Sequence, residues 1–355
     1  LVTGLNFRDV MTAMGLLPGF TDAPLPLLGW ECVGEIIAIG THTKRVQVGD
    51  MVIAIAPGCF GRYIDTNESL VVAKPDNITM EEAATLPIAF ITAYYSLVTL
   101  GRIDHHNRVL IHAATGGVGL AAIQWAKIWK AEIFATAGSP EKRRYLEEMG
   151  IPHVMESRNT KFADEIMVRT QNKGVDVILN SLGGEGMQKS LSVLAPYGRF
   201  IEIGKTDLLR HQSVDLHHFE QNISYHTVDL ARLSMDQPDL VGSMLEHVIS
   251  QTAAGKIKPL PLTAFPIQEV QSAYRTMSQA HHIGKLLVTG NDDPVMMQLK
   301  VDDPVIKPDA TYLITGGMGA IGQIITEWLI DQGARHIILL GRRDITQEKV
   351  KSLLA

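Results

Sequence analysis

Residues 109–120 read VLIHAATGGVGL, and this stretch decides the fold of the central part of the chain. A short apolar strand runs into a turn with small residues at 113, 116 and 119, and a helical segment follows. Such a turn brings backbone N–H groups and the positive end of a helix to a phosphate, and small residues leave room for it. The stretch predicts a dinucleotide-binding turn. Its expected cofactor contacts are Thr115, Gly116, Gly117, Val118 and Gly119.

Further short apolar runs follow this turn, at 131–135, 175–179 and 199–203, with helical-length segments between most of them. Buried parallel strands joined by crossover helices have this pattern. We therefore expect a doubly wound parallel sheet, a Rossmann domain, over residues 101–259.

The segments on either side of this domain have a different pattern of residues. Residues 1–100 are rich in Gly and Pro and contain β-type runs at 32–39 and 51–55, and a similar run appears at 285–288. The pattern predicts a mostly antiparallel β domain for substrate binding, built from residues 1–100 and 260–290. The whole chain is expected to have an α/β fold.

Acidic residues and prolines at 291–308 indicate a linker. The nucleotide-binding pattern then restarts at 312–317, so residues 309–355 are expected to hold an incomplete second Rossmann unit.

Composition excludes several classes of function. The chain has 32 Lys and Arg against 38 Asp and Glu, a net charge of -6, which argues against nucleic-acid binding. Only two cysteines occur, Cys32 and Cys59, which favours a reducing compartment over a disulfide scaffold. Neither a membrane span nor a metal site is expected, because long apolar runs are missing and the histidine pairs are adjacent residues that chelate poorly. We expect a cytoplasmic protein.

The strand at 131–135 leads into residues 136–139, where no Asp or Glu stands to hold the ribose hydroxyls of NAD. Ser139 and Lys142 stand there instead, and a hydroxyl and an ammonium attract a 2′-phosphate. The sequence thus favours NADPH. Arg143 is expected to belong to the solvated face of the next helix.

The sequence resembles the medium-chain reductase superfamily, and within it the enoyl reductase domains of modular polyketide synthases and animal-type fatty acid synthases. The similarity covers about residues 1–290. The motifs that carry it are Leu5-Asn6-Phe7-Arg8-Asp9, Gly29-Trp30-Glu31-Cys32-Val33-Gly34, Ala84-Thr85-Leu86-Pro87, His112 to Gly119, Asn180-Ser181-Leu182, Glu202-Ile203-Gly204-Lys205 and His282-Ile283-Gly284-Lys285. Family members have strands before the first motif, so the β domain is expected to be N-terminally truncated. Zinc-dependent relatives carry metal ligands in the first two motifs, where this sequence has Asn6 and Trp30.

The resemblance implies NADPH-dependent reduction of the 2,3 double bond of an enoyl thioester, carried by the phosphopantetheine of an acyl carrier protein. Hydride goes to the β carbon and a proton to the α carbon. The family's proton-donor pair corresponds to Lys205 and Asp229. The remaining expected cofactor contacts, including two that line the nicotinamide pocket (Asn6 and Thr92), are Asn6, Thr92, Ser157, Asn180, Gly204 and Lys285.

The C-terminal residues resemble the start of a ketoreductase catalytic subdomain, with a glycine pattern at 315–322 and Gly-Arg-Arg at 341–343. Neighbouring synthase domains, a ketoreductase among them, are therefore expected partners. The Ser, Tyr and Lys of ketoreductase catalysis do not occur in this tail, so we expect it to be inert alone.

One position departs from many polyketide relatives, which have a Tyr before Pro-Gly where this sequence has Leu17-Pro18-Gly19. Proton donation is then left to Lys205, Asp229 or water. Three alternatives stay open: a stand-alone reductase like quinone oxidoreductase, a cyclopropane-forming domain acting on a halogenated enoyl thioester, and a degenerate structural module.

Overall fold

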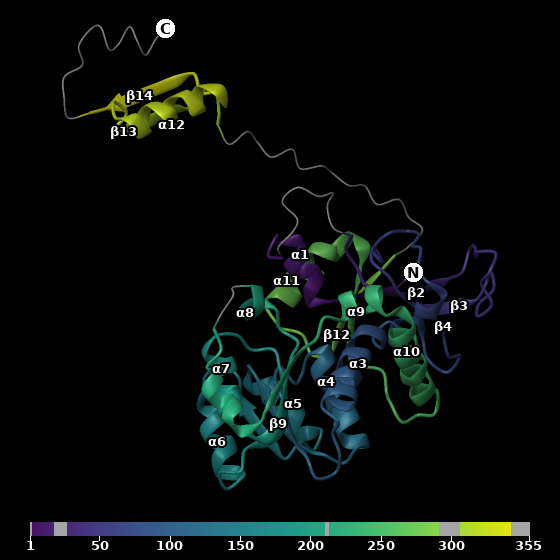
Figure 1. The fold of residues 1–355 in the computed structure, drawn as a ribbon. Coiled ribbons are helices and arrows are strands. Elements are labelled where there is room, and N and C mark those ends of the chain that lie inside the picture. Colours follow the sequence, from purple (N-terminus) through teal and green to yellow (C-terminus); the bar gives the residue numbers. More distant parts are fainter. Residues whose placement is uncertain (1, 18–26, 210–212, 291–305, 342–355) are drawn as a thin grey trace. The chain divides into compact units, whose positions relative to one another are not determined.

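A computed structural model describes residues 2–17, 27–209, 213–290 and 306–341 of the chain (Figure 1). The chain divides into two compact units, Leu1–Asp293 and Pro294–Ala355. The predicted linker at 291–308 lies outside the described residues, apart from its last three positions.

The first sheet of the larger unit combines strands from both of its ends, in the order β11-β12-β1-β2-β3-β4. Its strands are β1 Val2–Leu5, β2 Glu31–Glu35, β3 Met51–Ile55, β4 Val71–Ala73, β11 Leu262–Pro266 and β12 Lys285–Thr289. Every neighbouring pair is antiparallel except β11 with β12. The predicted mostly antiparallel sheet is confirmed. Cys32 and Cys59 are buried as free thiols.

The second sheet is parallel throughout, in the order β10-β9-β8-β5-β6-β7. Its strands are β5 Arg108–Ile111, β6 Glu132–Ala137, β7 His153–Glu156, β8 Val175–Asn180, β9 Leu194–Glu202 and β10 Ser224–Thr227. This is the predicted doubly wound sheet. Sequence analysis missed β7 and β10, because these two strands lie at the edges of the sheet and carry polar residues instead of a continuous apolar run.

Helices connect and cover the two sheets. They are α1 Phe7–Ala13, α2 Met80–Ala83, α3 Pro87–Tyr94, α4 Gly117–Ile128, α5 Pro140–Glu148, α6 Lys161–Arg169, α7 Glu185–Ser192, α8 Thr206–Leu209, α9 Leu230–Asp236, α10 Pro238–Ala253 and α11 Val270–Ser278. Short 3-10 helices span Glu68–Leu70, Leu216–Gln221 and Ile267–Glu269, and a π-helix spans Tyr95–Leu100.

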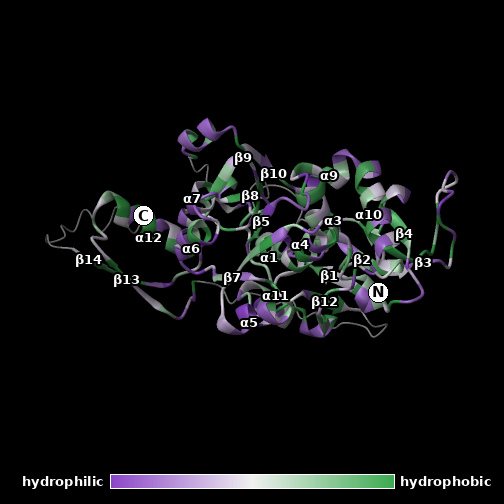
Figure 2. Ribbon diagram, turned by 90° about the horizontal axis from the view of Figure 1, so that it is seen from below, coloured by the Kyte–Doolittle hydropathy of each residue, from purple (hydrophilic) through white to green (hydrophobic). Residues whose placement is uncertain are grey.

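The two sheets share one hydrophobic core. Its largest cluster includes Val33 and Ile53 from the first sheet and Ile111 and Ile133 from the second, together with residues of α3 and α4. Hydrophobic residues gather on these two helices, whereas α5 is largely hydrophilic (Figure 2). Burial of this continuous apolar surface fixes the two sheets against each other.

One helical stretch, Met80–Leu100, has the length and apolar composition of a membrane-spanning helix, and sequence analysis did not single it out. Its apolar window is 67% buried inside the fold, as in the core helix of a globular domain.

The described residues of the smaller unit, 306–341, form a βαβ element, in which β13 (Thr311–Thr315) pairs in parallel with β14 (His336–Leu340) and α12 (Ala320–Asp331) connects them. Gly316 has φ +70°, a left-handed conformation that suits glycine. The predicted second nucleotide-binding turn therefore has the strand–turn–helix form. Residues 342–355, including Arg342 and Arg343, lie outside the described part of the chain.

His112 ties three elements of the parallel sheet together. Its Nδ1 lies 2.8 Å from the hydroxyl of Thr136 on β6, and its Nε2 lies 2.8 Å from the hydroxyl of Ser190 on α7. The Ser190 hydroxyl already donates to the carbonyl of Gly186, so it accepts from the Nε2–H group, which makes the Nε2–H tautomer the consistent one. Burial lowers the pKa of His112 to about 3, so the ring is neutral.

We expect His112→Phe to lower the free energy of unfolding by about 1–3 kcal/mol at pH 7, because the buried Thr136 hydroxyl loses its acceptor and the Ser190 hydroxyl loses the hydrogen bond that it accepts. The exposed His281 provides the control, and His281→Phe should change stability by less than about 0.5 kcal/mol. Urea denaturation measures both.

The stability of the unaltered protein should also fall as the pH is lowered from about 6.5 toward 3, because His112 takes up a proton in the unfolded chain but not in the folded one. His112→Phe should lack the part of this pH-dependent loss that comes from His112. If His112→Phe and His281→Phe lost equal stability, both at pH 7 and on acidification, His112 would not have this structural role.

Candidate active site

The predicted dinucleotide cradle is formed by the turn between β5 and α4. Gly116 is the N-cap of α4, and Gly117, Val118 and Gly119 form its first turn. A Cβ on Gly119 would lie 2.6 Å from the carbonyl oxygen of Ala113, so the helix can approach the strand only with glycine there. The positive end of α4 and its free N–H groups therefore face the carboxyl edge of the sheet, as a pyrophosphate site requires. The residues fit a dinucleotide.

The segment before β12 closes one side of this cradle. The backbone N–H of Gly284 donates to the carbonyl of Thr115 at 2.8 Å, and Gly284 pairs with Gly116 in an isolated bridge. Gly284 has φ +79°, and a Cβ there would collide with the carbonyl of Pro261. The turn therefore depends on glycine, and it carries the next residue, Lys285, directly beneath the cradle.

Lys285 forms a buried ion pair with Glu31. Its Nζ lies 2.5 Å from Oε1 of Glu31 and donates to Oδ1 of Asn6 at 2.7 Å, and the two charged side chains are 5% and 0% exposed. The Asn6 amide donates to Glu31 at 2.8 Å, and the N–H of Ile88, in α3, donates to the other Glu31 oxygen. The structure thus places Lys285 and Asn6 side by side, as predicted cofactor contacts should be, but their polar atoms are bound to each other and to Glu31.

Lys205 and Asp229 meet at the carboxyl edge of the parallel sheet. Lys205 follows β9, and Asp229 follows β10 and is the N-cap of α9, accepting from the N–H of Arg232. Because β9 and β10 are parallel neighbours, their carboxyl ends lie together, and the ammonium of Lys205 donates to Oδ2 of Asp229. The predicted pair is therefore formed by residues that are 24 positions apart.

The charges around this pair act unequally on its two members. Burial and the nearby Arg8 lower the pKa of Lys205, although the bond to Asp229 opposes this. Burial alone would raise the pKa of Asp229, but Lys205, the N–H of Arg232 and Arg8 hold it below its usual value. Asp229 is thus a carboxylate at neutral pH, and the ammonium of Lys205 is a stronger acid than an ordinary lysine.

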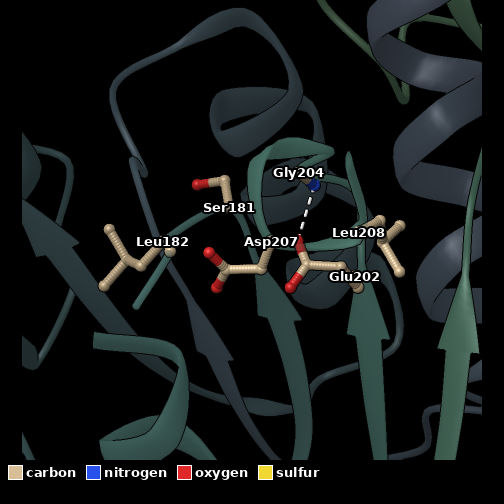
Figure 3. Close-up of a pocket in the computed structure, with 7 residues that line it drawn as sticks. Ser181, Leu182, Glu202, Gly204, Asp207 and Leu208 are labelled. Carbon is tan, nitrogen blue, oxygen red and sulfur yellow. Dashed lines mark hydrogen bonds between the residues drawn. The ribbon is translucent and has the colours of Figure 1, made fainter. Parts of the chain in front are cut away.

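Glu202, the last residue of β9, hydrogen-bonds to the segment that leads to Lys205, and Figure 3 shows its bond to Gly204. Its Oε1 accepts from the N–H of Gly204 and its Oε2 from the amide of Asn180, both at 2.6 Å. Burial raises the pKa of Glu202 to about 7. Asn180 also donates to the carbonyl of Leu182, so its amide is engaged inside the protein. A small pocket of about 10 Å³ is lined here by Ser181, Leu182, Gly183, Glu202, Gly204, Asp207 and Leu208.

The other end of the cofactor groove lies beside Gly138. Ser139 is the N-cap of α5, and Lys142 in the same helix donates from Nζ to the carbonyl of Ala280. A Cβ on Gly138 would meet Arg158 at 3.3 Å and Ser157 at 3.6 Å, so these two side chains border the same point. Burial and repulsion by Arg158 lower the pKa of Lys142. A hollow of about 460 Å³ is lined by Ser157, Arg158, Asn159, Thr160, Leu182, Gly183, Glu185 and Gly186.

Two further residues for which the sequence made predictions, Thr92 and Arg143, lie away from the Lys205–Asp229 pair along the chain and are at least partly buried. Thr92 is 7% exposed on α3. Arg143 was expected on a solvated face, yet it is half-buried, donates to the carbonyl of Ala137 and pairs with Glu156 at 3.9 Å. In the Leu17-Pro18-Gly19 segment, Pro18 and Gly19 lie outside the described residues.

Sequence analysis assigned no role to Arg8, Glu31, Arg158 or Glu202. Glu31 and Glu202 are charged residues within apolar strands, a signal that could have marked them as partners of a buried cation or amide. Arg158 follows β7, an edge strand that the apolar pattern did not reveal. Within the described residues, no group of three or more His, Cys, Asp or Glu side chains could hold a metal ion.

Comparison with known proteins identifies the family. Residues 1–76 match the alcohol dehydrogenase GroES-like domain, residues 117–252 the zinc-binding dehydrogenase family, and residues 310–355 the KR domain. The crystal structure of CurK enoyl reductase is 44% identical, with a TM-score of 0.75, and the match covers 82% of this chain and 89% of that one. The chain belongs to the polyketide synthase enoyl reductases. Its residues 310–355 are similar to a KR domain.

Two other relatives of the enoyl reductase bear on its function. A phenolphthiocerol/phthiocerol polyketide synthase protein of Mycobacterium tuberculosis is 43% identical over 346 residues, 96% of this chain and 16% of that protein. The chain thus spans about a sixth of that relative. The CurF ER cyclopropanase from the curacin A biosynthetic pathway is 36% identical, with a TM-score of 0.76, and the match covers 82% of this chain and 89% of that one. The enoyl reductase is an oxidoreductase that binds a nicotinamide cofactor.

Lys285→Met should lower the free energy of unfolding of the enoyl reductase by about 3–5 kcal/mol, because it leaves the Glu31 carboxylate buried and unpaired. The double variant Glu31→Gln/Lys285→Met removes both charges and should recover most of this loss. Urea denaturation of the two variants measures the difference. Equal stability of single and double variants would show that the ion pair does not hold this region together.

Proposed function

We propose that this domain catalyses the NADPH-dependent reduction of the 2,3 double bond of an enoyl thioester, with Lys205 and Asp229 as the proton-donating pair. The observation that carries the proposal is the contact between these two side chains at the edge of the sheet that also carries the glycine cradle. Ligands of doubly wound folds bind at this edge.

Bound NADPH would supply the hydride for the β carbon. The residues of the chain then have two tasks: to stabilise the negative charge on the thioester oxygen and to deliver a proton to the α carbon. Lys205 can do both, because its ammonium is charged and its pKa is lowered by burial. Asp229 holds the ammonium in one direction and remains ionised as it does so. After donation, the neutral amine regains its proton from solvent, to which Lys205 is 23% exposed.

The preference for NADPH is supported by the groups around Gly138. Neither Gly138 nor Ser139, the two residues directly after β6, is a carboxylate, and Lys142, Ser157 and Arg158 lie near them. Two cations near each other repel in the free protein, and a 2′-phosphate between them would relieve that repulsion. Arg158 thus joins the two residues that the sequence suggested.

The acyl group is proposed to arrive on the phosphopantetheine arm of an acyl carrier protein, within a synthase that also contains the ketoreductase whose first residues follow this domain. The similarity to polyketide synthases over nearly the whole chain supports this context. The likeness to a cyclopropanase keeps a halogenated enoyl substrate as the second candidate. Both reactions begin with hydride addition and differ in what the enolate then attacks.

The test is to mix the full chain with NADPH and crotonyl-pantetheine, follow the nicotinamide absorbance, and identify the acyl product by mass. We expect butyryl-pantetheine. Lys205→Met and Asp229→Asn should lower kcat by about 10²–10⁴-fold while the KM for NADPH stays nearly constant. Lys173→Ala, an exposed lysine just before β8 and so at the opposite edge of the sheet, serves as the control. Undiminished turnover by Lys205→Met would assign the proton to another donor.

Arg158→Ala should raise the KM for NADPH roughly tenfold and leave the KM for NADH unchanged, because only NADPH has a 2′-phosphate to lose its charged partner. Steady-state kinetics with the two cofactors measure the ratio. An equal rise for NADH would mean that Arg158 shapes the groove without recognising the phosphate.

A further inference from the structure

Arg8 connects the two sheets of the larger unit at the proposed active site. It lies in α1, directly after β1 of the antiparallel sheet, whereas Asp229 begins α9 after β10 of the parallel sheet. Nη1 of Arg8 lies 3.5 Å from Oδ1 of Asp229, a contact between residues 221 positions apart. The guanidinium also lies over Trp30, 5.1 Å from the ring centroid, a cation–π contact that favours this position of the side chain.

The two oxygens of Asp229 face different cations. Oδ1 faces Arg8 and accepts from the N–H of Arg232, and Oδ2 accepts from the ammonium of Lys205. A carboxylate held on one side by a fixed arginine and a helix N-terminus cannot turn freely. Its second oxygen is therefore presented to Lys205 in one direction.

We propose that Arg8 is a positioning residue for the proton-donating pair: it holds Asp229 with Oδ2 toward Lys205 and places a permanent second positive charge beside the ammonium. The part of this inference that concerns turnover rests on the proposed function of Lys205. The part that concerns the charge on Lys205 does not depend on that function, because it is argued from the contacts that Arg8 and Lys205 make with Asp229.

Two cations, Arg8 and Lys205, face the single carboxylate of Asp229. Arginine stays protonated at every pH at which proteins fold, so Arg8 and Lys205 together place two cations on one carboxylate. Burial and Arg8 both lower the pKa of Lys205, against the effect of Asp229. Arg8 therefore makes the ammonium readier to release its proton to an enolate, and its charge also attracts that enolate.

The other charged groups at these strand ends are already committed to different partners. Glu202 holds Gly204 and Asn180, and Asp207 accepts from the N–H of Gly184 at 2.7 Å. The side chain of Arg232 turns to Asp236, at 2.9 Å. A change at Arg8 should thus act mainly on Asp229 and Lys205.

The experiment compares Arg8→Gln and Arg8→Lys with the unaltered chain and with Arg169→Gln. Arg169 is a matched control, since it also pairs with a carboxylate, Glu165, but on α6. The first measurement needs no turnover: the rate at which acetic anhydride labels Lys205 is followed against pH by mass spectrometry of its peptide. In Arg8→Gln the midpoint should move to higher pH, because the ammonium loses a neighbouring cation. It should stay in place in Arg8→Lys and Arg169→Gln.

The second measurement is the pH dependence of kcat with NADPH and crotonyl-pantetheine. Arg8→Gln should lower kcat about tenfold at pH 7, leave the KM for NADPH unchanged, and move the alkaline limb in the same direction as the labelling midpoint. Arg8→Lys should return the alkaline limb of the pH profile to its original position but restore only part of kcat, because a lysine keeps the charge and lacks the planar guanidinium that lies over Trp30 and reaches Asp229. If Arg8 served only to stabilise the fold, Arg8→Gln would lower the fraction of active protein but leave the alkaline limb of the kcat–pH profile in place.

The outcomes separate the two proposals. A labelling midpoint that does not move in Arg8→Gln overturns the inference about Arg8, whatever the activity. A midpoint that moves while the unaltered chain fails to reduce the thioester supports Arg8 and rejects the proposed function. If Arg8→Gln does not fold, Trp30→Leu keeps the arginine but removes its platform, and it should move the midpoint in the same direction by a smaller amount.

Discussion

The buried ion pair between Lys285 and Glu31 is the interaction on which the rest of the active site depends. It joins β12 to β2, and Asn6 and the N–H of Ile88 bind the same carboxylate from α1 and α3. Two charges without water require such complete hydrogen bonding, since either one alone would be severely destabilising. The pair thereby fixes the turn at Gly284 against the cradle, and it couples the antiparallel sheet to the site where the cofactor phosphates are expected.

The parallel sheet supplies the second constraint. All of its strands end at one edge, so residues that follow different strands are brought together there without any sequence proximity. The cradle after β5, Glu202 at the end of β9, and the pair formed by Lys205 and Asp229 after β9 and β10 all lie at this edge. Asp229 with the two cations Lys205 and Arg8 forms a partly buried cluster that has one net positive charge, which would suit the enolate of the proposed reaction.

Periodicity and small residues were sufficient to predict much of this molecule. The strand–turn–helix at Gly116 to Gly119, the central strands of the parallel sheet and the βαβ unit near the C-terminus follow from apolar runs and glycine spacing. The edge strands β7 and β10 did not follow from them, because a strand with one neighbour and an exposed face needs no apolar run. Because Arg158 follows β7 and Asp229 follows β10, sequence analysis could not predict the position of Arg158 or the neighbours of Asp229.

The sequence by itself determined the fold class and the strand–turn–helix of the cradle, since these depend on local geometry and on motifs of adjacent residues. The family resemblance pointed to Lys205 and Asp229 as the pair that we propose donates the proton. Only the tertiary structure decided which groups surround them. It showed that Lys285, Asn6 and Asn180 are bound within the protein, and that Arg8 shares Asp229 with Lys205. Contacts across more than 200 positions depend on how two sheets pack, and no local pattern in a single sequence encodes the distance between them.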